Sequence, residues 1–421
     1  IPWVMWAVIR LKDTPNRSNM GILALLMGLQ LQRAHVQIAY YTWMIAGLLV
    51  IMLLFKFYEK NSNNFKWVIY SISSFSLGLG MAMWIYLPVI NYTPYSIRSA
   101  GIQGGAGFEY ATQWSFSYSE IATFFIPSFL GFGGATYWGS MPFTDYPNYM
   151  GILVLIFAII GFFFYEGKVK WIFTITALLA LALSFGKHFF LYSVFYNYFP
   201  YFSKFRVPAM FLVLTQFSIS ILAGLGLETI YNLTKNDNRK LIYKKIIGLF
   251  LMVISFIFLL KLFFIPRLGN FPKYPQYNLP LDVKLYFDQI RIDMINYDIT
   301  IISLIIFITI VIIYCIYNKL FSKKVLISCI IFISIIDMVL IDRSIIDPDK
   351  NQYRSSTLIK TINQSTYFIE DEIIKYLKQD STKYRILPLH ALASENRWSA
   401  FGIESIEGYH PAKISNYNNR P

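Results

Sequence analysis

The chain has 421 residues, of which 56% are hydrophobic, 18% aromatic and only 14% charged, whereas an average soluble domain carries about 25% charged residues. This composition excludes a string of soluble domains and excludes a disordered chain more firmly. The net charge of +14 does not indicate nucleic-acid binding, because no basic helix or aromatic-basic strand pattern accompanies it. Basic loops beside membrane helices explain the charge instead.

The apolar segments, taken in chain order, predict a polytopic membrane protein. A spanning helix needs about 20 mostly apolar residues. Ile1–Ile9 resembles the end of a crossing, and Met20–Leu31 is short enough to be a re-entrant helix. Longer apolar runs follow at Val36–Phe57, Phe65–Ile90, Tyr149–Tyr165, Trp171–Phe185, Val207–Tyr231, Ile246–Phe264, Ile299–Tyr317 and Val325–Ile341. The sequence therefore predicts an all-α membrane domain over residues 1–341, with about nine transmembrane helices.

The distribution of Lys and Arg predicts the orientation of these crossings. If the loop Arg10–Arg17 is cytoplasmic and each long run crosses once, the cytoplasmic loops hold 16 Lys or Arg in 45 residues. The opposite loops, up to residue 341, hold 9 in 115 residues. This bias follows the positive-inside rule. It places residues 91–148, Gly186–Arg206, Pro266–Asp298 and everything from Asp342 onward on the outer face.

The polar residues indicate where chemistry takes place. Transporters usually carry ionisable residues near the middle of their helices, but here the helix centres are mostly free of them. Ile246–Phe264 carries only Lys261, and Asp337 is the exception in the last run; each lies toward the outer end. Chemistry at the outer face is therefore favoured over conduction through the bilayer.

The long outer loop, residues 91–148, contains four charged residues, Arg98, Glu109, Glu120 and Asp145. Long loops in compact domains are usually functional. Trp114–Ile126 has an amphipathic pattern and predicts a helix lying flat at the membrane interface. Gly131–Gly151 combines glycines with aromatic residues, among them Tyr137 and Trp138. Aromatic rings suit a sugar or a lipid head group, but an aromatic belt that packs the loop onto the helices is an equally open interpretation.

A basic cluster in Gly186–Arg206 is unusual on a predicted outer face. Lys204 and Arg206 invite a phosphate-binding interpretation, because a guanidinium group matches a phosphate with two parallel donors. Snorkelling to lipid head groups is the alternative. The histidines show no metal-binding spacing, although His35, at the outer end of a short helix, is a candidate for an outer pocket.

The tail, residues 342–421, differs from the rest because its charges are mixed and its apolar content is ordinary. Phe368–Leu377 predicts an amphipathic helix and Tyr384–Leu389 predicts a strand. We therefore expect the beginning of a small soluble α+β domain outside the membrane, cut short at Pro421.

Several of these stretches together resemble the YfhO family of bacterial integral membrane proteins, which are related to the GT-C membrane glycosyltransferases. The resemblance rests on Gly28–Tyr41, Tyr110–Ser119, Tyr137–Gly151, Lys204–Leu227, and the tail segments Tyr384–Leu389 and Phe401–Lys413. These segments keep their order over nearly the whole chain.

The resemblance implies a multi-pass enzyme of the bacterial inner membrane. It would transfer a sugar from a polyprenyl-phosphate-linked donor to a cell-envelope polymer or glycolipid acceptor at the outer face. GT-C enzymes usually place a catalytic acid in the first outer loop, and we expect that loop to precede Ile1, so that this sequence is a fragment.

Among the residues present, Asp145 is the predicted catalytic acid, orienting the acceptor or holding a divalent metal. Lys204 and Arg206, with Arg98 behind them, are predicted to contact the phosphate. His35, Glu120, Tyr137 and Trp138 complete the predicted substrate-binding set.

Two further functions stay open. The first is a transporter or flippase for lipid-linked envelope precursors, which needs a polar path through the helices. The second is a non-catalytic envelope assembly protein that binds a partner through the outer domain. A polar groove at the outer face favours the enzyme, and a continuous central cavity favours the transporter.

Overall fold

The computed structural model describes most of the chain. The described residues are 1–33, 35–56, 62–96, 107–232, 239–263, 265, 280–318, 320, 322–346, 368–389 and 397–406. Arg98, a predicted phosphate contact, lies outside them, as does most of the tail segment Phe401–Lys413.

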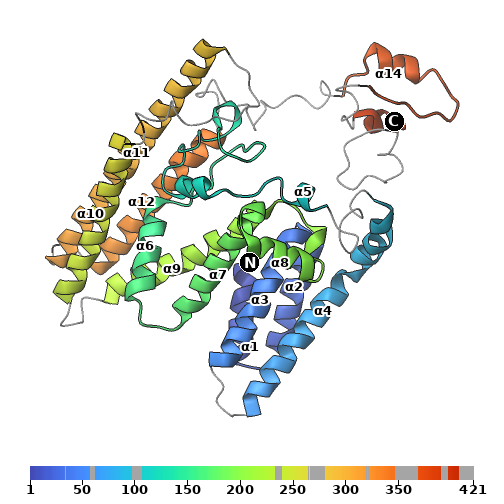
Figure 1. The fold of residues 1–421 in the computed structure, drawn as a ribbon. Helices are drawn as coiled ribbons and strands as arrows, with labels where there is room; N and C mark the ends of the chain where they lie inside the picture. Colours follow the sequence, from blue (N-terminus) through green and yellow to red (C-terminus); the bar gives the residue numbers. More distant parts are fainter. Residues whose placement is uncertain are drawn as a thin grey trace.

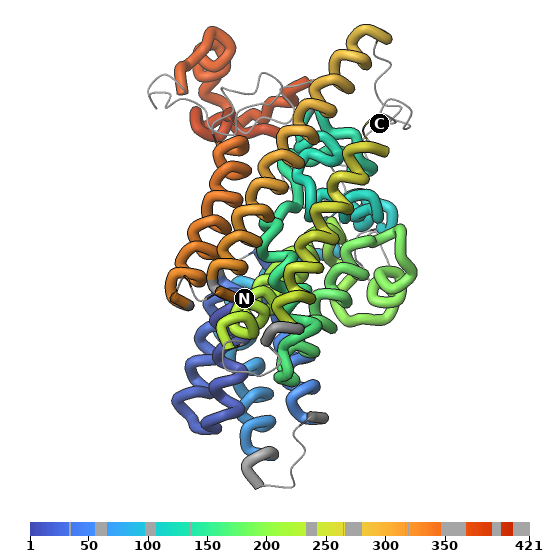
Figure 2. Tube along the Cα trace, turned by 90° about the vertical axis from the view of Figure 1, so that its left-hand side faces the viewer, coloured from blue at the N-terminus to red at the C-terminus, as the bar shows by residue number. Residues whose placement is uncertain are grey.

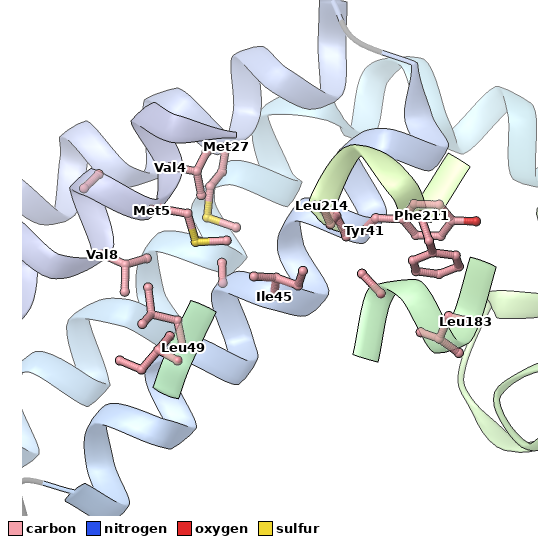
Figure 3. Packing of buried hydrophobic residues seen from close by; sticks show 14 of the residues in the cluster. Val4, Met5, Val8, Met27, Tyr41, Ile45, Leu49, Leu183, Phe211 and Leu214 are labelled. Atoms are coloured by element: carbon pink, nitrogen blue, oxygen red, sulfur yellow. The ribbon is translucent and has the colours of Figure 1, made fainter. Parts of the chain in front are cut away.

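The first helical group comprises α1 (Pro2–Asp13), α2 (Arg17–Arg33), α3 (Val36–Lys56) and α4 (Ser62–Tyr92). Both short N-terminal segments lie in helices, Ile1–Ile9 mostly in α1 and Met20–Leu31 in α2. Their buried side chains pack together with residues of α7–α9, as Figure 3 shows around Met27 and Ile45. The ring of Tyr41 on α3 stacks on Phe211, with ring centroids 3.6 Å apart, and so joins this group to the next.

The central group comprises α6 (Ile152–Phe164), α7 (Val169–Ser184), α8 (Phe190–Tyr198) and α9 (Leu212–Asn232). α6 and α9 cross closely, backbone against backbone, at Gly161 and Gly226. A Cβ on Gly161 would collide with the carbonyl oxygen of Leu222, and a Cβ on Gly226 with that of Phe157. Small residues at a crossing are the usual way in which membrane helices approach closely.

The third group, drawn in yellow to orange in Figures 1 and 2, comprises α10 (Arg239–Phe263), α11 (Leu281–Tyr317) and α12 (Lys323–Ile346). At 1.5 Å per residue, the 37 residues of α11 extend about 55 Å, well beyond the ~30 Å of a bilayer's hydrocarbon core. Its first half carries charged residues and its second half is apolar. One end of α11 therefore projects past any membrane that the other end spans.

Helix lengths support a membrane protein but not the full count of nine crossings. Six of the described helices are long and apolar enough to cross: α3, α4, α9, α10, α11 and α12. α6 and α7 are apolar but have only 13 and 16 residues, fewer than the ~20 that a crossing needs. The helical membrane class is thus confirmed, and the count of nine is not.

The ends of successive helices agree with an alternating path. The ends that join α3 to α4, α6 to α7, α9 to α10 and α11 to α12 lie toward the lower side of Figure 1. The segment from residue 107 to 148, the start of α11 and the end of α12 lie toward the upper side. These lower ends are the basic ones in the sequence, as the charge bias requires.

Three sequence expectations about the loops are wrong. Leu281–Asp298, expected in an outer loop, is the first half of α11. The charged residues of this segment interrupt the apolar run, which is why a loop was expected. Arg291, Ile295 and Asp298 nevertheless share one buried face of the helix. Gly186–Arg206, also expected as a loop, contains α8. Trp114–Ile126 is not an α-helix; it contains the short 3-10 helix η4 (Tyr118–Phe124).

The described part of the tail has a small core of its own. α14 (Glu372–Leu377) and the 3-10 helix η13 (Arg397–Phe401) pack around Ile374, Trp398 and Ile403. The predicted strand Tyr384–Leu389 forms an isolated parallel bridge, between Ile386 and Ser405. A strand needs a longer ladder, and both segments soon leave the described residues, so the α+β domain is not confirmed.

The glycine crossing yields a stability prediction. Gly161→Ala or Gly226→Ala should destabilise the protein by about 1–3 kcal/mol, the usual cost of overpacking, because the added methyl group meets backbone that cannot move aside. Thermal unfolding in detergent measures this. Gly224→Ala on α9 is the control, because its Cβ would meet nothing within 4 Å. Equal melting temperatures for all three variants would contradict the crossing.

Candidate functional site

The loop between α4 and α6 is docked onto the projecting half of α11 by two charged side chains. Arg291 is only 7% exposed and donates from Nε to the carbonyl of Thr136 at 2.8 Å, while its Nη1 lies 2.9 Å from Asp288 Oδ1. Seven residues further along α11, Asp298 Oδ2 accepts the amide proton of Ser128 at 2.7 Å. Both hydrogen bonds provide partners for backbone groups of the loop that no α-helix of the loop pairs.

A third charged residue anchors the point where the loop becomes α6. Asp337 of α12 accepts hydrogen bonds from the Tyr149 hydroxyl at 2.9 Å and from the Ile152 amide at 3.0 Å. Ile152 is the first residue of α6, and a carboxylate at a helix N-terminus satisfies a free amide and complements the helix dipole. Asp337, the exception in its apolar helix, is thus explained as an anchor.

A pocket opens within the docked loop. It is small, with a volume of about 10 Å³, which is about the space that one water molecule needs. Six of its ten lining residues have polar side-chain atoms: Glu120, Thr123, Tyr137, Thr144, Tyr146 and Asn148. Glu120 is the one ionisable acid in this lining.

Glu120 reaches the pocket because of the local backbone. In a 3-10 helix, residues three apart lie on the same side, and Ser117, Glu120 and Thr123 all point to the buried side of η4. The carboxylate accepts hydrogen bonds from the Tyr137 hydroxyl and the Ser140 amide. A Cβ on Gly139 would overlap both Glu120 and Tyr137, so the turn closes over the carboxylate only with glycine there.

Burial changes the acidity of this carboxyl group. Glu120 is 2% exposed, and loss of solvation raises its pKa from 4.5 to about 7, although the hydrogen bonds from Tyr137 and Ser140 work in the opposite direction. A carboxyl group that exchanges its proton near neutral pH is suited to acid–base chemistry.

The predicted acid Asp145 and the aromatic Trp138 lie beside the pocket without lining it. The side chain of Asp145 is exposed, while its neighbours Thr144 and Tyr146 line the pocket. The Trp138 amide donates to the Leu130 carbonyl at 3.0 Å, and its side chain packs against the main core. Tyr137 also packs against this core, and it lines the pocket as well.

The predicted phosphate contacts form a second group, after α8. Arg206 donates to the Tyr110 hydroxyl and lies over its ring, 5.2 Å from the centroid. Its carbonyl accepts a hydrogen bond from Gln37 near the start of α3. Lys204 is half-buried, and burial lowers its pKa. His35 is exposed, immediately before α3.

Trp114 connects the cationic group to the pocket. Its carbonyl accepts the amide proton of Ala209 at 3.1 Å, just beyond Arg206, and its indole donates to the Phe143 carbonyl at 3.2 Å, beside the pocket residue Thr144. Hydrogen bonds of Trp114 thus link the segments that carry the two predicted sets of residues.

Sequence reasoning missed the docking residues Arg291 and Asp298. Their signal was their spacing, since Arg291, Ile295, Asp298 and Ile302 recur at helical intervals. In the described part of the chain, no three acidic, His or Cys side chains gather as a metal site.

Comparisons with protein-family models, with curated proteins and with solved structures find no match for this chain.

The pocket acid gives the protein a pH-dependent stability. The unfolded chain releases the Glu120 proton near pH 4.5, whereas the folded chain holds it to about pH 7. The folded state is therefore favoured below pH 4.5, and this contribution, on the order of 3 kcal/mol, is lost as the pH rises to 7. Thermal melts between pH 4 and 8 should show this decline. Glu120→Gln should remove it; an unchanged slope would contradict the buried acid.

The docking of the loop is tested by Asp298→Asn. Replacing a charged acceptor by a neutral one weakens a bond of about 1.5–3 kcal/mol, so the Ser128 amide should exchange with deuterium roughly ten- to hundredfold faster. Hydrogen exchange followed by mass spectrometry measures this. Asp293→Asn is the matched control on the same helix, because Asp293 is exposed. Faster exchange in the control alone would refute the anchoring role.

Proposed function

We propose that this protein is a membrane glycosyltransferase of the bacterial inner membrane. It takes a sugar from a polyprenyl-phosphate donor at the outer face and passes it to a cell-envelope polymer or glycolipid. The proposal includes about nine crossings, an outward-facing loop 91–148 and an outward-facing tail. The resemblance to the YfhO family suggests the reaction, and the loop supplies the geometry that fits it.

The observation that carries the proposal is a small polar pocket with a buried acid, held at one end of an apolar helical bundle. Hydroxyl, amide and aromatic side chains are the usual partners of a sugar ring. A transferase also needs an acid–base group near neutral pH, and Glu120 provides one beside Asp145, which is exposed and able to orient an acceptor.

The cationic group supports the donor side of the reaction. Charge builds on the departing lipid phosphate as the sugar–phosphate bond breaks, and fixed cations stabilise it. The segment that carries Lys204 and Arg206 is linked to the pocket loop through hydrogen bonds of Trp114, and His35 and Arg98 are further candidates. A divalent metal could share this task, and membrane lipids would surround the donor.

Transport or flipping of a lipid-linked precursor is the weaker candidate. The described helices bury few ionisable side chains, and the two carboxylates buried on α11 and α12, Asp298 and Asp337, are engaged in anchoring the loop. A non-catalytic assembly role through the tail does not use the buried acid of the pocket.

The decisive assay supplies the full-length protein in liposomes with radiolabelled polyprenyl-phosphate sugar and envelope fractions. We expect label to appear in the acceptor. If the folded protein transfers no label with donor supplied, the enzyme proposal fails and the assembly role becomes the better one.

Donor binding is tested separately by Arg206→Ala. Loss of a charge-assisted bond to phosphate costs about 1.5–3 kcal/mol, so donor affinity should fall roughly ten- to hundredfold in a liposome binding assay. Lys66→Ala is the control, because Lys66 also lies over an aromatic ring, Tyr70, but near the basic end of α4. Unchanged affinity in Arg206→Ala would remove this residue from the site.

A further inference from the structure

The turn from Tyr137 to Met141 is shaped around the Glu120 carboxylate. The Tyr137 hydroxyl donates its proton to Glu120 Oε1 and at the same time accepts the amide proton of Met141 at 3.0 Å. The Ser140 amide donates to the same carboxylate. Two donors on one short turn therefore hold the carboxylate, and the hydroxyl that does so is itself held by the backbone.

Gly139 makes this arrangement possible. A side chain at this position would overlap the hydroxyl of Tyr137 and Oε1 of Glu120. The backbone of the turn therefore lies directly against the hydrogen-bonded pair, which limits the orientations open to the carboxylate. A residue that serves only to fill space needs no such fixed orientation.

The position of the pair also matters. Both Glu120 and Tyr137 line the pocket, next to Thr144 and Tyr146. The Glu120 carboxylate is thus hydrogen-bonded to the turn and still lines the pocket. Asp145, by contrast, has an exposed side chain and no comparable support from the residues that surround the pocket.

From this geometry we propose that Glu120 accepts the proton of the acceptor hydroxyl, and that Tyr137 is the positioning residue that orients Glu120 for this step. The proposal rests on the proposed function and deepens it. In the step, the acceptor oxygen forms a bond to the anomeric carbon of the sugar. The bond from that carbon to the phosphate oxygen breaks and its electron pair leaves with the lipid phosphate. The hydroxyl proton moves to the Glu120 carboxylate.

The pH dependence of the reaction follows. Glu120 accepts a proton only when ionised, and burial raises its pKa to about 7, so the rate should rise through neutral pH and level off above it. Tyr137 donates to the ionised form and therefore favours it. Removing its hydroxyl should move the rise in rate to higher pH.

The test compares Glu120→Gln, Tyr137→Phe and Tyr118→Phe in the transfer assay across pH 5.5–9. Glu120→Gln should lose about 10²–10⁴-fold in rate on the high-pH plateau, and the rise in rate through neutral pH should disappear. Tyr137→Phe should be roughly tenfold slower at pH 7 and recover at higher pH. Tyr118 is the matched control, because it starts the same 3-10 helix but donates to the His188 carbonyl at 2.7 Å; its variant should keep the wild-type profile.

A second measurement does not depend on sugar transfer. The infrared carboxyl band that disappears in Glu120→Gln reports the titration midpoint of Glu120 in the full chain. Tyr137→Phe should raise that midpoint and Tyr118→Phe should not. Melting temperatures in detergent verify that each variant is folded.

The outcomes separate the two proposals. Near-normal transfer by folded Glu120→Gln overturns the role of Glu120, and an unmoved midpoint in Tyr137→Phe overturns the role of Tyr137. If the wild-type protein transfers no sugar, the proposed function fails and the proton-accepting role fails with it. The infrared midpoint then still decides whether Tyr137 orients the buried acid.

Discussion

The position of the loop between α4 and α6 depends on one constraint: the amides and carbonyls of buried irregular backbone need hydrogen-bond partners. The loop after α4 has little helix to provide them. Side chains of α11 and α12 supply partners instead, with Asp298 and Asp337 accepting amide protons and Arg291 donating to a carbonyl. The charges that look misplaced near apolar helices are therefore what fixes the loop, and with it the pocket.

The helices were largely predictable from the sequence, because apolar runs of about 20 residues have few other interpretations. The prediction of helices failed where charged residues lie within a helix. The first half of α11 was expected as a loop because Asp288, Arg291 and Asp298 interrupt its hydropathy, although these side chains point toward the protein rather than water. Hydropathy measures how well a side chain suits lipid, and it does not register a buried charged side chain that is hydrogen-bonded to neighbouring backbone.

The pocket was only partly predictable. Glu120 and Tyr137 were both expected to contact substrate, but their seventeen-residue separation in sequence gave no sign that they bond to each other. Asp145 was favoured as the acid because it lies on the predicted outer face in a loop with few charges. The difference between an exposed and a buried carboxylate is set by tertiary packing, here by η4 and the turn at Gly139, which no local pattern encodes.

The length of α11 has one more consequence. Its 37 residues exceed a bilayer's hydrocarbon core by about 25 Å, and the loop is fastened to the excess. The height of the pocket along α11 is therefore set by a rigid helix and not by a flexible segment. Inserting or deleting one helical turn would move the pocket by about 5.4 Å along the helix, so the height of the pocket above the apolar half of α11 is a property of helix length.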